Sequence, residues 1–186
     1  MSDWQNNIVA IMSGQRRGGF AAAGRAMLAI AEPLYAAIMI LRNTMYERGW
    51  LATHQAGRAV ISVGNLTTGG TGKTPIVAWI VHELRAMGYH PAVLLRGYKA
   101  VNGVSDEATL LRQLVAPSPV IARPDRVAAA ANAVMNDPQI DCFVLDDGFQ
   151  HRRLKRDCDV VLIDATRPFG FDHVLPRGLL REPIVG

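Results

Sequence analysis

Short apolar runs alternate with stretches of helical pattern along the chain from Ala59 onward. One helical stretch covers about residues 74–87; Gly88 ends it and Pro91 starts the next apolar run, as helix-stop residues do. Strands that alternate with helices at this spacing predict a mostly parallel sheet with helices on both faces. We therefore predict an α/β fold over residues 59–186. The runs expected to form its strands are AVISV, PAVLL, PVIA, CFVLD and DVVLID.

The most apolar stretch precedes this region and runs from Phe20 to Leu41. It is about as long as a membrane-spanning helix, but Arg25, Glu32 and Pro33 argue against a span. Because Arg25 and Glu32 lie one heptad apart, they share a narrow polar stripe on a helix whose remaining surface is apolar. We expect an amphipathic helix in a membrane interface, with its polar stripe outward. A helix buried in the core is the alternative, and the sequence alone leaves both open.

Arginines flank this stretch at positions 16, 17, 42 and 48, and Trp50 follows it. Near an anionic surface each basic group contributes on the order of 1 kcal/mol. The formal net charge of +4 also suits an anionic partner, without choosing among a nucleotide, a phospholipid surface and nucleic acid. We predict a membrane-interface helical segment over residues 1–58 and an α/β domain over residues 59–186.

The composition fits a globular chain, since 49% of the residues are hydrophobic and 19% are charged. The N-terminal residues lack the basic start, apolar centre and cleavage site of a secretory signal, so we expect the chain to stay in the cytoplasm. Cys142 and Cys158 show no CxxC spacing and no nearby metal-ligand histidines, which indicates reduced core thiols. The Pro- and Gly-rich stretch 166–186 ends without a closing strand or helix, so we expect a truncated chain.

The strongest chemical signal is a glycine-rich segment that follows the AVISV run and opens a helix, as a phosphate-binding loop does. Its glycines let backbone N–H groups turn toward phosphate oxygens, and Lys73 places a charge on the β- and γ-phosphates of ATP. The Thr74 hydroxyl is placed to bind Mg²⁺. Thr67 stands where the strict pattern has glycine, and a glycine-rich turn that merely precedes lysine is the alternative. The predicted nucleotide-binding residues are Thr67, Thr68, Gly69, Gly70, Thr71, Gly72, Lys73 and Thr74.

A second signal is the apolar strand CFVLD followed by Asp147 and Gly148. In phosphate-loop enzymes an acidic residue at the end of a neighbouring strand completes the magnesium site. We assign that role to Asp146. Asp147 is expected to face the cleft, because successive strand residues point to opposite sides. Without the GKT loop, the same residues would be an ordinary strand-ending turn.

A basic cluster, His151-Arg152-Arg153-Leu154-Lys155-Arg156, follows immediately. Phe149 is its one neighbouring aromatic residue, so phosphate groups of a substrate or membrane are favoured as targets over nucleic acid. A solvated basic turn is the alternative. Further upstream, Asp106 begins a helical pattern and by itself indicates a helix N-cap.

Five motifs occur here in the order seen in tetraacyldisaccharide 4'-kinases, and the chain resembles that family over nearly all of residues 60–183. GNLT followed by GGTGKTP, and DDGFQHR, are the specific ones; RGY, SDE and LREP are the others. The resemblance implies transfer of the ATP γ-phosphate, with Mg²⁺, to the 4'-hydroxyl of a tetraacylated glucosamine disaccharide 1-phosphate, giving lipid IVA. It places the enzyme peripherally at the cytoplasmic face of the inner membrane, with no nucleic-acid partner.

The resemblance also implies roles for individual residues. Asp106 is the carboxylate that activates the acceptor alcohol, together with a histidine from a later region that this chain lacks, and Lys73 and Asp147 complete the catalytic set. The residues assigned to the substrate are Arg96, Gln150, His151, Arg152 and Glu182. No feature of the sequence predicts an oligomeric state.

The chain departs from the family pattern at two loop positions, where Lys99 follows RGY and Ala108 follows the Asp-Glu pair. A second lobe that closes over the substrate is also missing. Two other functions stay open. One is a different phosphate-loop enzyme, such as an ATP-dependent ligase or a GTPase, although the guanine-specific NKxD sequence is absent. The other is a catalytically silent nucleotide-binding module at a membrane.

Overall fold

The computed structural model describes residues 3–69, 72–97 and 106–184, which fall into two compact units. The sheet unit comprises residues 51–65 and 70–162. The helical unit comprises residues 1–50, 66–69 and 163–186. The two units share the glycine-rich segment between them, because residues 66–69 belong to the helical unit and the rest to the sheet unit.

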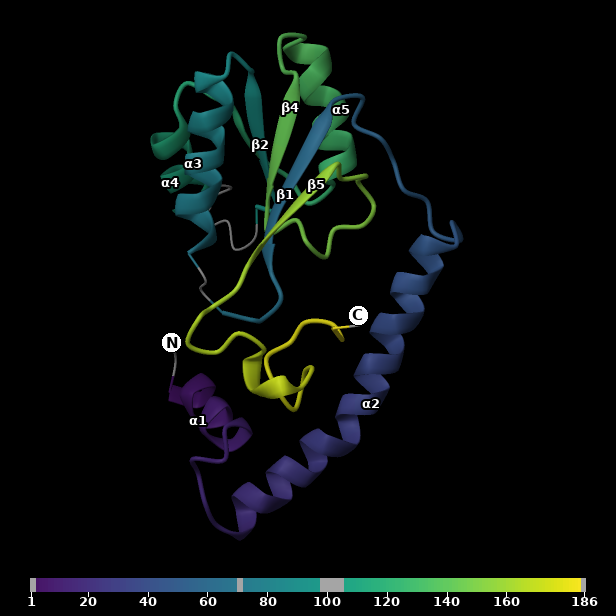
Figure 1. Ribbon diagram of the computed structural model, residues 1–186, viewed down its shortest axis with the longest axis vertical. Helices are drawn as coiled ribbons and strands as arrows, with labels where there is room; N and C mark the ends of the chain where they lie inside the picture. The colour runs from purple at the N-terminus through teal and green to yellow at the C-terminus, as the bar shows by residue number, and fades with distance from the viewer. Residues whose placement is uncertain (1–2, 70–71, 98–105, 185–186) are drawn as a thin grey trace. The chain divides into compact units, whose positions relative to one another are not determined.

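The sheet unit is built on five parallel strands in the order β3-β2-β4-β1-β5 (Figure 1). Each strand lies where an apolar run predicted one. The runs PAVLL and CFVLD, which form two interior strands, are buried along their whole length, as expected for parallel strands covered on both faces. The strands are β1 (Ala59–Asn65), β2 (Pro91–Leu95), β3 (Val120–Ala122), β4 (Cys142–Asp146) and β5 (Cys158–Leu162).

Helices cover both faces of this sheet, which confirms the predicted α/β fold (Figure 1). On one face α3 (Lys73–Ala86) and α4 (Asp106–Val115) pack on Val63, Val93 and Val144. On the other face α5 (Arg126–Asn136) packs its alanines on Val60, Leu94 and Phe143. The alternation of these buried side chains along each strand is the period of two that a sheet imposes.

The helical unit contains α1 (Asp3–Met12), the long helix α2 (Gly19–Glu47) and a short 3₁₀ turn, η1 (Gly170–Asp172). Three polar residues on one face of α2 contact the segment 163–184. The Tyr35 hydroxyl donates to the Arg181 carbonyl at 2.7 Å, and Asn43 Nδ2 donates to Glu182 Oε2 at 2.8 Å. Glu32 binds His173 Nδ1 at 3.0 Å and Arg177 Nη1 at 3.1 Å.

These contacts correct the orientation predicted for Glu32. Its side chain is 17% exposed and ion-paired, so it does not lie on an outward polar stripe with Arg25. Arg25 donates instead to the carbonyl of Arg16 at 2.9 Å. The sequence could not reveal this, because the partners of Glu32 lie far away along the chain.

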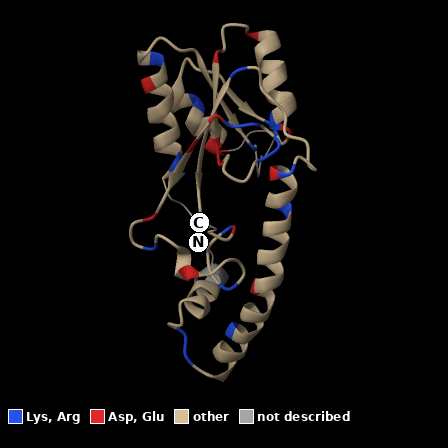
Figure 2. Ribbon diagram, turned by 45° about the vertical axis from the view of Figure 1, so that its right-hand side comes forward, with Lys and Arg blue, Asp and Glu red and all other residues tan. Residues whose placement is uncertain are grey.

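The opposite face of α2 is exposed and apolar. Its residues recur at spacings of three, four or seven positions, so they form one stripe along the helix. The apolar window of α2 is long and hydrophobic enough to cross a membrane by length and composition alone, and 6% of it is buried. Charged residues are sparse along this helix in Figure 2. The α2 stripe consists of Phe20, Met27, Ile30, Leu34, Ile38 and Leu41.

Candidate phosphate-binding site

The carboxyl ends of β1 and β4 meet at one edge of the sheet, since the two strands are parallel neighbours with Val63 in register with Asp146. β1 ends at Asn65, and α3 begins at Lys73. Gly72 precedes that helix in the left-handed conformation, with a φ of 72°, which glycine adopts without steric cost. The strand, loop and helix context predicted for a phosphate loop is therefore present. Gly70 and Thr71 lie outside the described residues.

Lys73 reaches back over the ends of both strands. Its Nζ donates to Asn65 Oδ1 at 3.1 Å and lies 3.7 Å from Asp147 Oδ1. The lysine side chain is 13% exposed, so its charge acts in a partly desolvated setting where electrostatic interactions are strong. The helix N-terminus beside it adds the positive end of the helix dipole. Together these features suit an anion.

Asp146 is 2% exposed, and its Oδ1 has no hydrogen-bond partner among the residues that the structure describes. Burial, reinforced by the negative charge of Glu107, raises the pKa of Asp146 to about 6. A buried carboxylate oxygen of this kind calls for a cation. Thr74, in the first turn of α3, adds a hydroxyl. Oxygen ligands of these types are the ones that Mg²⁺ prefers.

The described residues contain no group of three or more His, Cys, Asp or Glu side chains that could hold a metal ion by themselves. Mg²⁺ commonly takes one or two protein oxygens and completes its shell with phosphates and water. Asp146 and Thr74 carry side-chain oxygens of this kind.

Asp147 faces outward for a different reason from the predicted one. β4 ends at Asp146, and Asp147 itself adopts a left-handed backbone conformation with a φ of 49°. Gly148 follows in a place with no room for a side chain, because a Cβ there would lie 2.7 Å from the Leu145 Cβ and 2.8 Å from the Ser62 Oγ. The turn, and not the alternation of an extended strand, directs the second carboxylate.

A cavity of about 270 Å³ opens at this edge and brings three predicted site residues, Lys73, Asp146 and Asp147, together with a fourth, Arg96. It also contains two charged residues that sequence reasoning left without a role, Glu107 and Arg126. Its lining residues are Lys73, Leu95, Arg96, Glu107, Arg126, Asp146 and Asp147.

Arg126 is the first residue of α5 and is 3% exposed. Burial lowers the pKa of its guanidinium, and the nearby Asp147 carboxylate opposes that change. One signal in the sequence could have drawn attention to it. A cation in the first turn of a helix opposes the helix dipole, so an arginine at that position needs a compensating partner.

The basic segment after β4 is largely engaged with the protein itself. Arg156 donates to the carbonyls of Gly148 and Phe149 and lies 3.3 Å from Asp159. The backbone N–H of Arg152 donates to the Gln150 carbonyl at 3.1 Å. His151 is half-buried, and burial together with the charge of Arg126 lowers its pKa to about 4.

The remaining predicted site residues lie at other places. Asp106 is exposed as the first residue of α4 and is not among the described residues that line the cavity. Within the helical unit, the Thr68 N–H is already bonded to the Leu179 carbonyl at 2.8 Å. Thr67 is 6% exposed and pairs with Leu180, whereas Gly69 is exposed. Glu182 is 7% exposed and holds Asn43.

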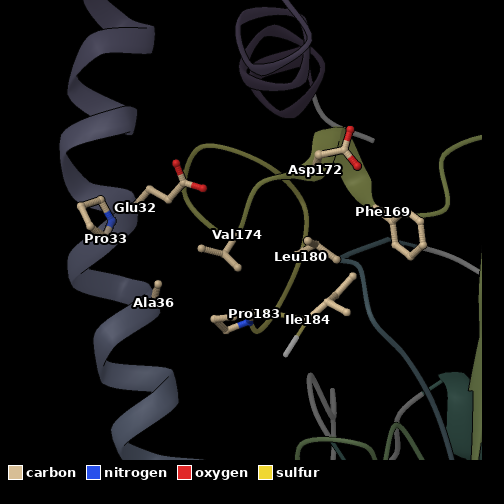
Figure 3. Close-up of a pocket in the computed structure, with 9 residues that line it drawn as sticks. All are labelled: Glu32, Pro33, Ala36, Phe169, Asp172, Val174, Leu180, Pro183 and Ile184. Atoms are coloured by element: carbon tan, nitrogen blue, oxygen red, sulfur yellow. The ribbon is translucent and has the colours of Figure 1, made fainter. Parts of the chain in front are cut away.

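A second, larger cavity of about 610 Å³ lies in the helical unit beside α2 (Figure 3). Apolar side chains form most of its wall, and the carboxylates of Glu32 and Asp172 stand at its edge. Its lining residues are Glu32, Pro33, Ala36, Phe169, Asp172, Val174, Leu180, Pro183 and Ile184.

A parallel sheet whose first strand leads through a GKT loop into a helix, next to a strand that ends in a buried aspartate, defines a phosphate-loop α/β protein. Within that class the chain belongs to the tetraacyldisaccharide-1-P 4'-kinase family, LpxK, whose model matches residues 24–186. The family resemblance inferred from the sequence is thereby confirmed.

Individual relatives agree with the family match. The chain is 44% identical over 175 residues to the tetraacyldisaccharide 4'-kinase of Syntrophus aciditrophicus, a match that covers 84% of this chain and 46% of that protein. The corresponding protein of Anaeromyxobacter dehalogenans is 39% identical, with coverages of 96% and 51%. The crystal structure of LpxK from Aquifex aeolicus in complex with ATP is 33% identical and superposes with a TM-score of 0.75, covering 86% of this chain and 54% of that chain. The chain thus spans about half the length of these relatives.

Because His151 is half-buried, the free energy of unfolding should depend on its protonation. Its folded-state pKa of about 4 lies below its ordinary value of 6.5, so between these values the unfolded state binds the proton more readily. The contribution of His151 to the free energy of unfolding should therefore hold steady above about pH 6.5 and fall as the pH drops toward 4, whereas the raised pKa of Asp146 acts in the opposite direction. Urea unfolding of the parent and of His151→Gln at pH 7 and pH 5 isolates this contribution, because the variant lacks it. The exposed His54 provides the control, His54→Gln. Equal pH dependence in all three proteins would contradict the account.

Proposed function

We propose that the intact protein transfers the γ-phosphate of ATP to the 4'-hydroxyl of a tetraacyldisaccharide 1-phosphate, the reaction of lipid A synthesis that yields lipid IVA. The observation that carries this proposal is the contact of Lys73 with Asp147, next to the buried Asp146 that ends β4, in a chain of the LpxK family. The related LpxK from Aquifex aeolicus was crystallised with ATP, which supports the choice of nucleotide.

Phosphoryl transfer requires mainly positioning and charge neutralisation. Lys73 binds the β- and γ-phosphate oxygens, and the positive end of the α3 dipole beside it favours the same anion. Asp146 and Thr74 hold Mg²⁺. When bound, this ion neutralises charge on the β- and γ-phosphates. Lys73 then exchanges its contact with Asp147 for the nucleotide, and Asp147 remains in the lining of the cavity.

Asp106 accepts the proton of the 4'-hydroxyl in this proposal. Its exposed position at the start of α4 suits contact with an incoming substrate, and the Glu107 beside it already lines the phosphate cavity. Arg96 lines the same cavity and binds phosphate groups. The remaining residues that we assign to the disaccharide are Gln150, His151, Arg152 and Glu182.

We further propose a peripheral location at the cytoplasmic face of the inner membrane, with α2 in the plane of the interface. The α2 stripe occupies one side of the helix, whereas the other side is tied to segment 163–186 by Glu32, Tyr35 and Asn43. A spanning helix would need lipid-compatible residues all round. Arg48 stacks on Trp50 at the end of α2, a pairing suited to headgroups. The apolar cavity beside α2 offers hydrocarbon surroundings to an acyl chain.

Removal of the Lys73 charge should abolish phosphoryl transfer. Loss of one contact that neutralises developing charge typically costs ~3–4 kcal/mol, or a hundredfold or more in kcat. Lys73→Ala in the full-length enzyme is assayed by transfer of labelled phosphate from ATP to the tetraacyldisaccharide 1-phosphate. The matched control is Lys155→Ala, which removes an exposed lysine outside the cavity. Activity of Lys73→Ala within threefold of the parent would refute the phosphate-loop assignment.

Asp106→Ala should lower turnover and leave ATP affinity nearly unchanged, because the proposed partner of Asp106 is the acceptor hydroxyl. A purely helix-capping role would instead cost about 1 kcal/mol of stability and preserve the chemical step. Single-turnover kinetics, ATP titration and thermal melting of the same variant separate the two roles. A variant that melts early but reacts at the parental rate would remove Asp106 from the mechanism.

Polar substitutions on the α2 stripe should release the protein from anionic vesicles. A Met27→Gln/Ile30→Gln/Leu34→Gln variant removes apolar side chains that the proposed interface would bury. Each is worth roughly 1.5–3 kcal/mol of membrane binding, and co-sedimentation measures the loss. High salt should weaken binding of the parent, because the flanking arginines contribute through screened charges. Trp79→Gln, at an exposed apolar residue of the sheet unit, is the control and should still sediment. Unchanged binding of the triple variant would contradict the interfacial location.

A further inference from the structure

The turn that follows β4 holds Asp147 in a left-handed backbone conformation. Asp147 has a φ of 49°, in the left-handed region that is unfavourable for residues with a Cβ. The next residue, Gly148, donates its N–H to the Val63 carbonyl at 3.0 Å. That bond fixes one side of the turn, and the His151 N–H donates to the Gly148 carbonyl at 2.8 Å. Arginine side chains engage the carbonyls of Asp147, Gly148 and Phe149 as well.

Arg126 holds the first of these carbonyls. Arg126 is the first residue of α5, and its Nη1 donates to the backbone carbonyl oxygen of Asp147 at a distance of 3.1 Å. Asp125 caps that helix by accepting from the Val127 N–H at 3.0 Å and the Ala128 N–H at 3.1 Å. The cap fixes where the helix begins, and therefore where the 3% exposed arginine emerges.

Arg156 holds the next two carbonyls. Its Nη1 donates to the oxygens of Gly148 and Phe149, and its Nη2 lies 3.3 Å from Asp159 Oδ2 on β5. Phe149 is in turn packed on Gly64 of β1, where a Cβ would lie 2.4 Å from the Phe149 Cβ. The second arginine is thus anchored in the sheet and engages a part of the turn that Arg126 does not reach.

We propose that Arg126 and Arg156 form a two-part guanidinium clamp on the 147–149 turn that positions Asp146 and Asp147 to bind the metal of a metal–nucleotide complex. Both arginines are positioning residues, because they act through the backbone of the turn. A guanidinium suits this task, since its planar array of donors can satisfy several oxygens at once. The inference rests on the proposed function only for the identity of the nucleotide.

A direct role for Arg126 is the competing explanation, because this arginine also lines the phosphate cavity and could bind a phosphate group. Arg156 separates the two explanations, since it is not among the described residues that line that cavity. If the clamp matters, loss of either arginine must produce the same defect in metal binding. If Arg126 is a phosphate ligand, only its loss has an effect, and that effect falls on the nucleotide.

The test uses the full-length protein and Mn²⁺ as the probe ion, with a non-hydrolysable ATP analogue. Electron paramagnetic resonance gives the Mn²⁺ affinity of the analogue complex, and calorimetry in EDTA gives the affinity for the metal-free analogue. We expect Arg126→Met and Arg156→Met each to weaken Mn²⁺ binding at least fivefold while keeping metal-free binding within twofold. Arg123→Met, at an exposed arginine just before α5, should match the parent in both measurements.

Two results would overturn the clamp. One is unchanged Mn²⁺ affinity in both methionine variants, and the other is weakened metal-free binding in Arg126→Met together with normal behaviour of Arg156→Met. Thermal melting identifies a variant that fails to fold, and Arg126→Lys or Arg156→Lys then replaces it under the same criteria. Because neither readout requires the lipid substrate, a parent enzyme that fails to phosphorylate lipid would refute the proposed function and leave this test intact.

Discussion

The parallel pairing of β1 with β4 is the constraint on which the site depends. It sets Val63 of β1 beside Asp146 of β4. The strand that leads into the glycine-rich segment therefore ends next to Asp146 and the Asp147 that follows it. Lys73 can then reach Asn65 on one side and Asp147 on the other. A shift of one residue in this register would turn Asp146 out of the site and disrupt the buried faces of the sheet, which explains why packing and chemistry are specified together.

Much of the sheet and the centre of the site could be predicted from the sequence, because both depend on local patterns. Apolar runs bounded by Gly and Pro identify strands without tertiary information, and GKT after a strand predicts that Lys73 begins the next helix. The contributions of Arg126 and Glu107 could not be predicted, since they depend on which helix N-terminus meets the end of β4. The left-handed turn at Asp147 likewise depends on contacts with residues distant in the chain.

The long helix α2 shows the same limit. Its amphipathic character follows from the sequence, but the placement of Glu32 does not, because His173 and Arg177 are its partners from the other end of the chain. These ion pairs cover the polar side of the helix, and one apolar stripe stays exposed. The helix therefore has two separate tasks, anchoring segment 163–186 on one side and presenting hydrocarbon-compatible surface on the other.

The charges around the phosphate cavity complete this account. Lys73, Arg96 and Arg126 line this cavity together with Glu107, Asp146 and Asp147, so it offers cations to phosphate oxygens and carboxylates to a metal ion. A crystal structure of the full-length protein with Mg²⁺ and a non-hydrolysable ATP analogue tests the central claim most directly. The account predicts Lys73 Nζ within hydrogen-bond distance of the β- and γ-phosphate oxygens, and a metal ion bound by Asp146 and the Thr74 hydroxyl. A nucleotide bound elsewhere, with Lys73 still paired to Asp147, would contradict it.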